Sequence, residues 1–444
     1  MQQQDQQYAI EFEQLEKRLN GMASSPIHKI RKEAIARFSA LGFPTTKQEE
    51  WRFTNVAPVA RTAFTPALQF DGQGVSADVV KRYSLGDAVG GLLVFINGHW
   101  SREHSRLSGL PQGVTVENLS SAMATRGELV SRYLSRYVPF AEHSFAALNT
   151  AFMQDGVFIH LPDGASVESP LHILYFAAGG DQPFMATPRN LIVMGKNCRL
   201  SLAESYVGLT DFPYLTTAVS EVVVGEDSVL EHDKMQVEGA HAFHVGLTAI
   251  HQDGRSVVTS NSIALGGQLV RNEVTVVFAG EGSESTLNGL SVATGKQLVD
   301  NHTTIDHARA NCVSHELYKS ILDGTSHGVF NGKILVRPDA QKTDARQTNK
   351  TLLLSGDAVI NTKPQLEIFA DDVKCTHGAT VGQLDDEQLF YLRSRGIGLQ
   401  AARDLLTFAF ASDVAGRIHI DPFREQLDAL LHERLREGRI VKDV

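Results

Sequence analysis

The residues best able to do chemistry in this sequence lie close together near position 375. Cys375 and His377 are separated by a single residue. On a β-strand two such residues point to the same side, with Cα atoms about 6.5 Å apart. A thiolate and an imidazole side by side can bind a soft or borderline metal such as iron or zinc. Because two ligands cannot complete a tetrahedral site, the spacing predicts a half-site that is completed elsewhere in the fold or by another chain.

The neighbours of this pair support two interpretations. Lys374 would favour the Cys375 thiolate electrostatically if its ammonium group lies close. Against a metal role, Val373, Cys375 and His377 alternate along the chain, so the face that carries them could be interior. Cysteine often serves there as a small buried residue. The pattern alone leaves both interpretations open.

The other cysteines and histidines give weaker signals. Cys198 and Cys312 each lie in an alternating apolar context, which favours packing. The three cysteines are widely spaced, so they exclude a disulfide framework and a CxxC zinc or thioredoxin motif. They also exclude a four-cysteine iron–sulfur site within one copy of the chain. His241 and His244 are three residues apart, but no third ligand is evident near them.

Three glycine-containing strings come close to nucleotide-binding signatures, and each fails. Residues 328–334 resemble a P-loop but are one residue short, with Ile334 where a hydroxyl should reach Mg²⁺. Residues 289–297 are one residue too long and end in glutamine. Residues 396–401 match a dinucleotide fingerprint but follow a predicted helix instead of a strand. The sequence also lacks HExxH and GxSxG motifs, so ordinary hydrolase chemistry is unsupported.

Composition narrows the class of protein. Of 444 residues, 42% are hydrophobic and 21% are charged, which is neither a disordered nor a membrane composition. The net charge is −10 and no basic patch is evident, which argues against a nucleic-acid partner. The polar, acidic N-terminus is not a secretory signal, and the longest apolar runs are far short of a membrane span. We therefore expect a soluble cytoplasmic protein with reduced thiols and no membrane association.

The elements that must position the Cys-His pair repeat along the middle of the chain. Short β-branched runs there end in turn residues at intervals near 15 positions. Repeats of this size favour a parallel β-solenoid in which two units, each with a strand of about five residues, make one coil. Small side chains would line the interior, which fits an aromatic content of 7%. An antiparallel sandwich with frequent turns is the alternative. The turn markers are Gly195, Gly208, Gly225, Gly239, Gly254, Gly267, Gly282, Gly295, Ala310, Gly324, Asp339, Gly356 and Asp372.

Helices are predicted on both sides of this core, which makes the protein mainly β with helical ends. Ser25-Pro26 is typical of a helix start, and Gly42 of its end. Asp385 begins another predicted helix, which ends at Gly396. The predicted regions are residues 1–60 (helical), 61–154 (mixed α/β), 155–383 (solenoid core) and 384–444 (C-terminal helical domain).

Several segments carry a resemblance to a known family. They include Glu-Glu-Trp-Arg-Phe-Thr at residues 49–54 and Cys-Thr-His-Gly at residues 375–378. The sequence here resembles the SufB/SufD family of the SUF iron–sulfur cluster assembly system, over about residues 45–412. The Cys-Thr-His-Gly motif favours the SufD branch, because SufB has different residues around its cysteine at this position. The remaining segments are residues 318–319, 328–334, 340–347, 352–355, 379–385 and 389–397.

The resemblance implies a fold, a role and a set of partners. The family fold is a right-handed parallel β-helix between helical terminal domains. A SufD subunit is a non-catalytic scaffold that pairs with SufB through the β-helices and holds the ATPase SufC through its C-terminal helices. The complex receives sulfur and iron and builds a nascent iron–sulfur cluster. The resemblance also leaves open whether the isolated chain forms a homodimer.

The resemblance also implies site residues. His377, with Cys375 beside it, matches the family's histidine at the SufB–SufD interface, where it is implicated as a ligand of a transient cluster shared with SufB. A reduced flavin, FAD, is associated with the assembled complex, but its contacts cannot be placed on this chain. The C-terminal helices are the candidate SufC docking site, with Leu389, Phe390, Gly396 and Ile397 as the expected contact residues.

Two other functions stay open from the residues alone. A β-helix enzyme acting on acidic polysaccharide would need paired carboxylates along one open face. Asp371 and Asp372 are such a pair in sequence, but consecutive residues of a strand face opposite ways. A structural adhesion solenoid would need a secretion signal, which the first residues do not provide.

Overall fold

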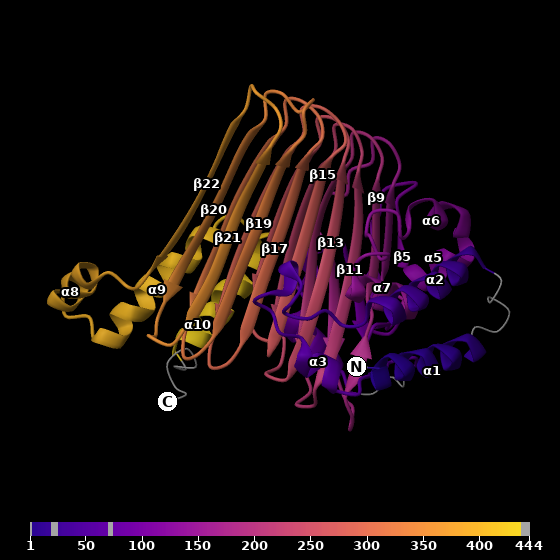
Figure 1. Ribbon diagram of the computed structural model, residues 1–444, viewed down its shortest axis with the longest axis horizontal. Coiled ribbons are helices and arrows are strands. Elements are labelled where there is room, and N and C mark those ends of the chain that lie inside the picture. Colours follow the sequence, from indigo (N-terminus) through magenta and orange to yellow (C-terminus); the bar gives the residue numbers. More distant parts are fainter. Residues whose placement is uncertain (1, 19–24, 70–73, 437–444) are drawn as a thin grey trace.

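The centre of the protein is a parallel β-solenoid (Figure 1), and the computed structural model describes residues 2–18, 25–69 and 74–436. From β9 onward, successive strands alternate between two sheets, and all ladder pairs among these strands are parallel. Sheet A contains β1 (Thr65–Pro66), β5 (Thr115–Asn118), β6 (Val157–Leu161), β8 (Phe184–Ala186), β9 (Arg189–Met194), β11 (Tyr214–Val224), β13 (Ala242–Gln252), β15 (Leu269–Phe278), β17 (Leu298–His307), β19 (His327–Val336) and β21 (Val359–Ile368). Sheet B contains β2 (Gly91–Ile96), β3 (His99–Trp100), β4 (Arg106–Leu107), β7 (Leu171–Ala177), β10 (Arg199–Gly208), β12 (Val229–Val237), β14 (Val257–Ala264), β16 (Glu284–Ala293), β18 (Val313–Leu322), β20 (Asp344–Leu353) and β22 (Lys374–Gly382).

Each coil consists of two consecutive strands, one in each sheet, as the repeat pattern predicts. Val229 of β12 pairs with Val257 of β14, which in turn pairs with Glu284 of β16. Each step covers two of the predicted intervals. Every turn marker falls between two strands except Gly208, which is the last residue of β10. The parallel solenoid is therefore confirmed, and the antiparallel sandwich is excluded.

Two predicted properties of the coil are wrong. The core strands from β10 to β22 are 8 to 11 residues long, not about five. They run past the apolar stretches because inward polar side chains bond to one another inside the solenoid, as His232 does to Glu204 at 2.8 Å. The interior also accepts aromatic rings. Phe95, Tyr175 and Tyr206 stack in register with 4.9 Å between successive ring centroids, an arrangement that parallel strands allow.

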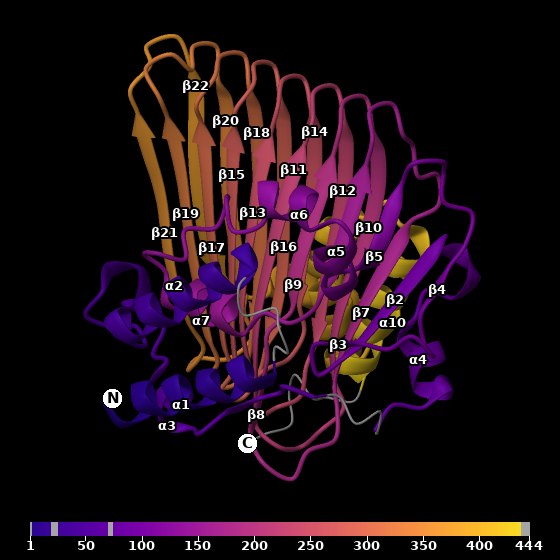
Figure 2. The same cartoon turned by 90° about the vertical axis from the view of Figure 1, so that its right-hand side faces the viewer.

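Helices cover the outer faces of both sheets. Most N-terminal helices pack against sheet A, whereas α4 and the C-terminal helices α9 and α10 pack against sheet B (Figure 2). As predicted, the Ser25 hydroxyl accepts the N–H of His28 at the start of α2, and Gly42 ends that helix. Asp385 caps α8 in the same way. The helices are α1 (Gln2–Arg18), α2 (Pro26–Leu41), α3 (Ala57–Arg61), α4 (Ala77–Tyr83), α5 (Leu119–Thr125), α6 (Gly127–Tyr133), α7 (Ser144–Phe152), α8 (Asp386–Ser394), α9 (Leu399–Ala415) and α10 (Asp421–Arg436), with 3-10 turns at Glu49–Trp51 and Gly86–Ala88.

The solenoid ends in an uncovered coil made of β21 and β22. β21 pairs only with β19, and β22 only with β20, so both strands leave a backbone edge unpaired among the described residues. Most side chains of β22 are exposed. Helix α8 lies beyond this end of the solenoid (Figure 1). A free strand edge of this length is a template for pairing with another chain. None of the helices in the described part of the chain has the length and apolar character needed to cross a membrane.

Candidate functional site

The structure places the Cys-His pair on β22, the last strand of the solenoid. Cys375 lies in register with Ala345 of β20, and His377 with Gln347. Ala345 is fully buried and Gln347 is 1% exposed, so both face the interior. Residues in register on neighbouring parallel strands share a face, so Cys375 and His377 point inward at the open end.

Cys375 is half-buried and packs against the apolar cluster that closes the last coils. Burial raises the pKa of its thiol, and the Asp344 carboxylate raises that pKa further. The predicted activation by Lys374 is therefore wrong. Lys374 is exposed and adjacent in sequence, so its side chain leaves the strand on the opposite face. With its pKa raised, the Cys375 thiol keeps its proton at neutral pH.

The side chain of His377 is exposed and makes no hydrogen bond, ion pair or ring contact with the described residues. The imidazole is therefore free to take a ligand. No cluster of three or more His, Cys, Asp or Glu side chains within the described ranges could hold a metal ion. The chain thus carries one thiol and one imidazole on one inward face at an unpaired strand edge, and both side chains are of types that can ligate a metal.

Cys198 and Cys312 occupy corners of the solenoid and are fully buried. The Cys198 N–H donates to the hydroxyl of Ser228, which lies 30 residues later at the equivalent corner of the next coil. Ser256 holds the same place one coil further and donates to the Asp253 carbonyl at 2.6 Å. The cysteines stand where other coils use small hydroxyl residues, so their position fits packing.

The remaining motifs receive structural roles. His244 is buried with its Nδ1 3.0 Å from Glu238 Oε2, whereas His241 is exposed in a turn, so the two do not converge. Residues 328–334 lie within β19 instead of forming a loop before a helix, which removes the P-loop interpretation. Residues 396–401 join α8 to the start of α9.

The expected docking residues of the C-terminal helices differ in how far their side chains are exposed. Leu389 is only 9% exposed, so it belongs to the packing of α8 against the rest of the chain. Phe390 is 75% exposed and its neighbour Tyr391 is 55% exposed. Gly396 has φ of 86° in the turn that follows α8, a conformation that favours glycine. Of the expected residues, Phe390 exposes the most apolar surface, and Tyr391 beside it is exposed as well. Leu399 and Leu405 on α9, each 49% exposed, add to the apolar surface of the C-terminal helices.

Comparison with known proteins decides the family. Residues 176–410 match the family model described as "SUF system FeS cluster assembly, SufBD core domain", and residues 2–173 match "SufBD protein N-terminal region". The chain belongs to the SufBD family. This SufBD protein is 30% identical to the iron–sulfur cluster assembly protein SufD of Escherichia coli over 408 residues, which are 89% of this chain and 90% of the relative. It is 33% identical to the iron–sulfur cluster assembly SufBD family protein slr0076 of Synechocystis over 419 residues, 92% of this chain and 91% of the relative. It is also 30% identical to protein ABCI7, chloroplastic, of Arabidopsis thaliana over 425 residues, 93% of this chain and 88% of the relative.

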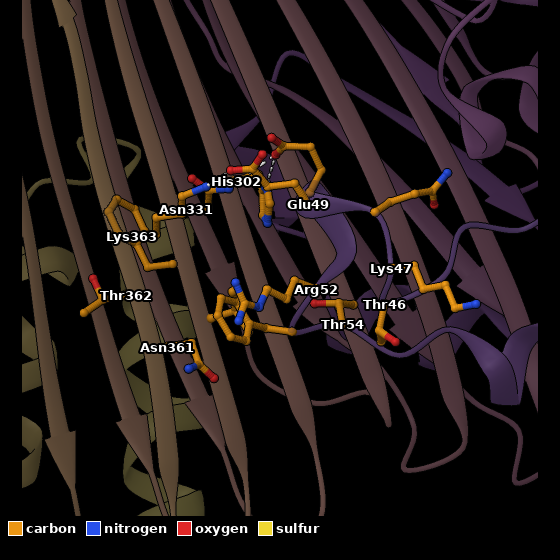
Figure 3. Close-up of a pocket in the computed structure, with 15 residues that line it drawn as sticks. Thr46, Lys47, Glu49, Arg52, Thr54, His302, Asn331, Asn361, Thr362 and Lys363 are labelled. Carbon is orange, nitrogen blue, oxygen red and sulfur yellow. Dashed lines mark hydrogen bonds and ion pairs between the residues drawn. The ribbon is translucent and has the colours of Figure 1, made fainter.

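The sequence analysis missed a buried ionic network that anchors the N-terminal region of this SufBD protein to sheet A. Arg271 bonds to Asp300 at 2.5 Å, and Asp300 lies 3.0 Å from His302. Burial acts to lower the pKa of His302, but the Asp300 carboxylate and the hydrogen bond to Glu50 outweigh it and raise that pKa to about 9. A pocket of about 570 Å³ lies beside this network, between residues 46–54 and the outer face of sheet A (Figure 3). A single sequence carries no signal that joins residue 50 to residue 302.

Proposed function

We propose that this protein is a SufD-type scaffold subunit of a SUF complex, which pairs with SufB through the open coil of the solenoid. The placement of Cys375 and His377 carries the proposal. Both lie on one face of the last strand, at a backbone edge that has no partner in the described part of the chain. A partner strand at this edge would bring further ligands to the same place. In the isolated chain, the same edge offers a route to a homodimer.

In this role the chain is non-catalytic, and iron and sulfur are its cargo. His377 supplies an imidazole nitrogen to the nascent cluster, and Cys375 supplies a thiolate once its proton is displaced. Ligands divided between two chains allow the cluster to be built when the chains are close and released when they separate. The raised pKa of Cys375 makes metal uptake by this residue weaker as the pH falls.

The C-terminal helices would hold the ATPase SufC. Phe390 and Tyr391 present adjacent aromatic rings to solvent on α8, which lies away from the body of the protein (Figure 1). Aromatic residues of this kind are frequent anchors of protein interfaces. Leu389, Gly396 and Ile397 would then shape the helix and its turn beneath the docking surface.

Flavin binding and polysaccharide chemistry receive less support. The dinucleotide-like string at residues 396–401 joins two helices, so it lacks the strand-to-helix turn that holds a pyrophosphate. Residues 396–401 are therefore not proposed as a flavin site. Asp371 and Asp372 lie in the turn before β22, where Asp372 pairs with Lys342, and they do not form a pair of catalytic acids. A cytoplasmic location would suit reduced thiols and a labile cluster.

The experiment is co-expression of this chain with SufB and SufC, followed by purification and measurement of iron, acid-labile sulfide and visible absorbance. His377→Ala is expected to assemble the complex but to hold less than half of the normal cluster. His315→Ala is the matched control. His315 lies on β18 next to the inward-facing Glu316, so it points outward, and its side chain makes no hydrogen bond or ion pair with the described residues. Equal cluster content in the two variants would rule out His377 as a ligand.

A further inference from the structure

If the imidazole of His377 is to hold a metal in one orientation, its other ring nitrogen needs a hydrogen-bond partner. A histidine that ligates a metal almost always donates its second ring N–H to a carboxylate, a carbonyl or water. His377 has no such partner among the described residues. The residue in register with it on the same face is Gln347 of β20, one strand spacing or about 4.8 Å away.

The side chain of Gln347 is held so that only its oxygen is free. Gln347 is 1% exposed, and its Nε2 donates to Glu316 Oε2 at 2.6 Å. Its Oε1 is buried and has no hydrogen-bond partner in the described part of the chain. The amide also lies against Gly332 of β19, where an added Cβ would collide with Gln347 Nε2. A buried oxygen without a partner is costly, so it is expected to accept a hydrogen bond in the working state.

Glu316 fixes the direction of that amide. It lies on β18, in register with Gln347, so Glu316, Gln347 and His377 form one row across the last three strands of sheet B. Glu316 is buried and has no ion pair among the described residues, so no cation competes for its carboxylate. Because the carboxylate accepts from the amide nitrogen, the amide oxygen is the group left to face the open coil.

We infer that Gln347, held by Glu316, is a positioning residue for His377. Its Oε1 would accept the N–H of the ring nitrogen that does not bind metal, which fixes the tautomer and direction of the imidazole. This inference rests on the proposed role of His377. Asn349, two residues along β20, is also 1% exposed and also has a free side-chain oxygen. It lies in register with Ala379, so it provides a control of the same chemistry one step away from the histidine.

The test uses the complex of the full chain with SufB and SufC, loaded with iron and sulfide and reduced for pulsed EPR. His377→Ala should remove the ¹⁴N coupling of the imidazole to the cluster. Gln347→Met should keep a ¹⁴N coupling but change its magnitude, and should speed cluster loss to a chelator about 10- to 100-fold. Glu316→Gln, which leaves the amide of Gln347 in place but less firmly directed, should change the coupling in the same sense with a smaller increase in rate. Asn349→Leu should match the wild type.

The outcomes separate the two claims. If His377→Ala leaves the coupling and the cluster unchanged, the proposed ligand role fails and the inference fails with it. If His377→Ala removes the coupling while Gln347→Met and Glu316→Gln both behave as Asn349→Leu does, the ligand role stands and the positioning role is overturned. A Gln347→Met chain that does not assemble leaves the decision to Glu316→Gln, because the Gln347 side chain is intact in that variant.

Discussion

The exposed ring of Phe390 gives the most direct measure of the proposed SufC contact. A phenylalanine side chain presents about 200 Å² of surface, and Phe390 is 75% exposed on α8. Complete burial would therefore remove about 150 Å² from water, worth about 4 kcal/mol at about 25 cal/mol per Å². Docking rarely buries a ring fully, and alanine keeps part of the area, so Phe390→Ala should cost about 2 kcal/mol, or about 30-fold in Kd.

The assay is titration calorimetry of SufC into the purified chain, with circular dichroism to verify the fold. Phe212 is the matched control because it is also exposed, at 43%, and lies in the turn between β10 and β11. Phe212→Ala should leave the Kd unchanged. Leu389→Ala would be a poor probe, since Leu389 is buried and its loss would weaken α8 itself. The docking argument is refuted if Phe390→Ala and Phe212→Ala bind SufC equally well.

Four further predictions concern the fold. The pKa of His302 is raised to about 9, so this residue contributes roughly 3 kcal/mol to the free energy of unfolding. The contribution is complete below about pH 6.5 and is lost as the pH rises through 9. Urea unfolding across that range should show the free energy of unfolding fall with pH, and His302→Gln should flatten this dependence. Burial raises the pKa of Glu316 to about 7, so its ionisation destabilises the folded protein above that pH. At pH 8.5, the Glu316→Gln variant should therefore unfold at a higher urea concentration than the wild type. Near pH 4.5, the two proteins should unfold at the same urea concentration. Cys198→Ser should change the free energy of unfolding by less than about 1 kcal/mol, because other coils carry serine at this corner, and a loss of soluble protein would contradict the packing role. Gly289→Ala should cost about 1–3 kcal/mol in thermal or urea unfolding, because the new Cβ would collide with the buried ring of Tyr318, and an unchanged midpoint would show that the ring can move.

Much of the fold follows from local signals. The turn residues from Gly225 to Gly356 each lie between two strands, since every coil is closed by its own short corners. Ser25 and Asp385 begin α2 and α8 by accepting backbone N–H groups in the first turn, an interaction that needs only neighbouring residues. The strands were harder to delimit. Polar residues such as Glu204 sit at inward positions, where a pattern of apolar runs does not register them.

The candidate site was only half predictable. The alternation of Cys375 and His377 gives their common face, because successive side chains on a strand point to opposite sides. The pKa of the Cys375 thiol is raised first by burial and then by the carboxylate of Asp344, which lies 31 positions earlier in the sequence but on the neighbouring strand of the ladder. On α8, Leu389 and Phe390 are adjacent and both apolar, so composition alone could not tell the packed residue from the exposed one.

The sequence by itself determined the repeating coil, the helix starts and the common face of Cys375 and His377, because these arise from residues close together along the chain. Tertiary structure alone decided that this pair lies at an unpaired edge and that Gln347 and Glu316 lie in one row with His377. It also decided that Glu50 is tied to His302 across the outer face of sheet A. The physical reason is that each coil returns the chain to the same face about two repeats later. Residues far apart in sequence thereby become neighbours, and the register that joins them is set by the packing of the whole solenoid.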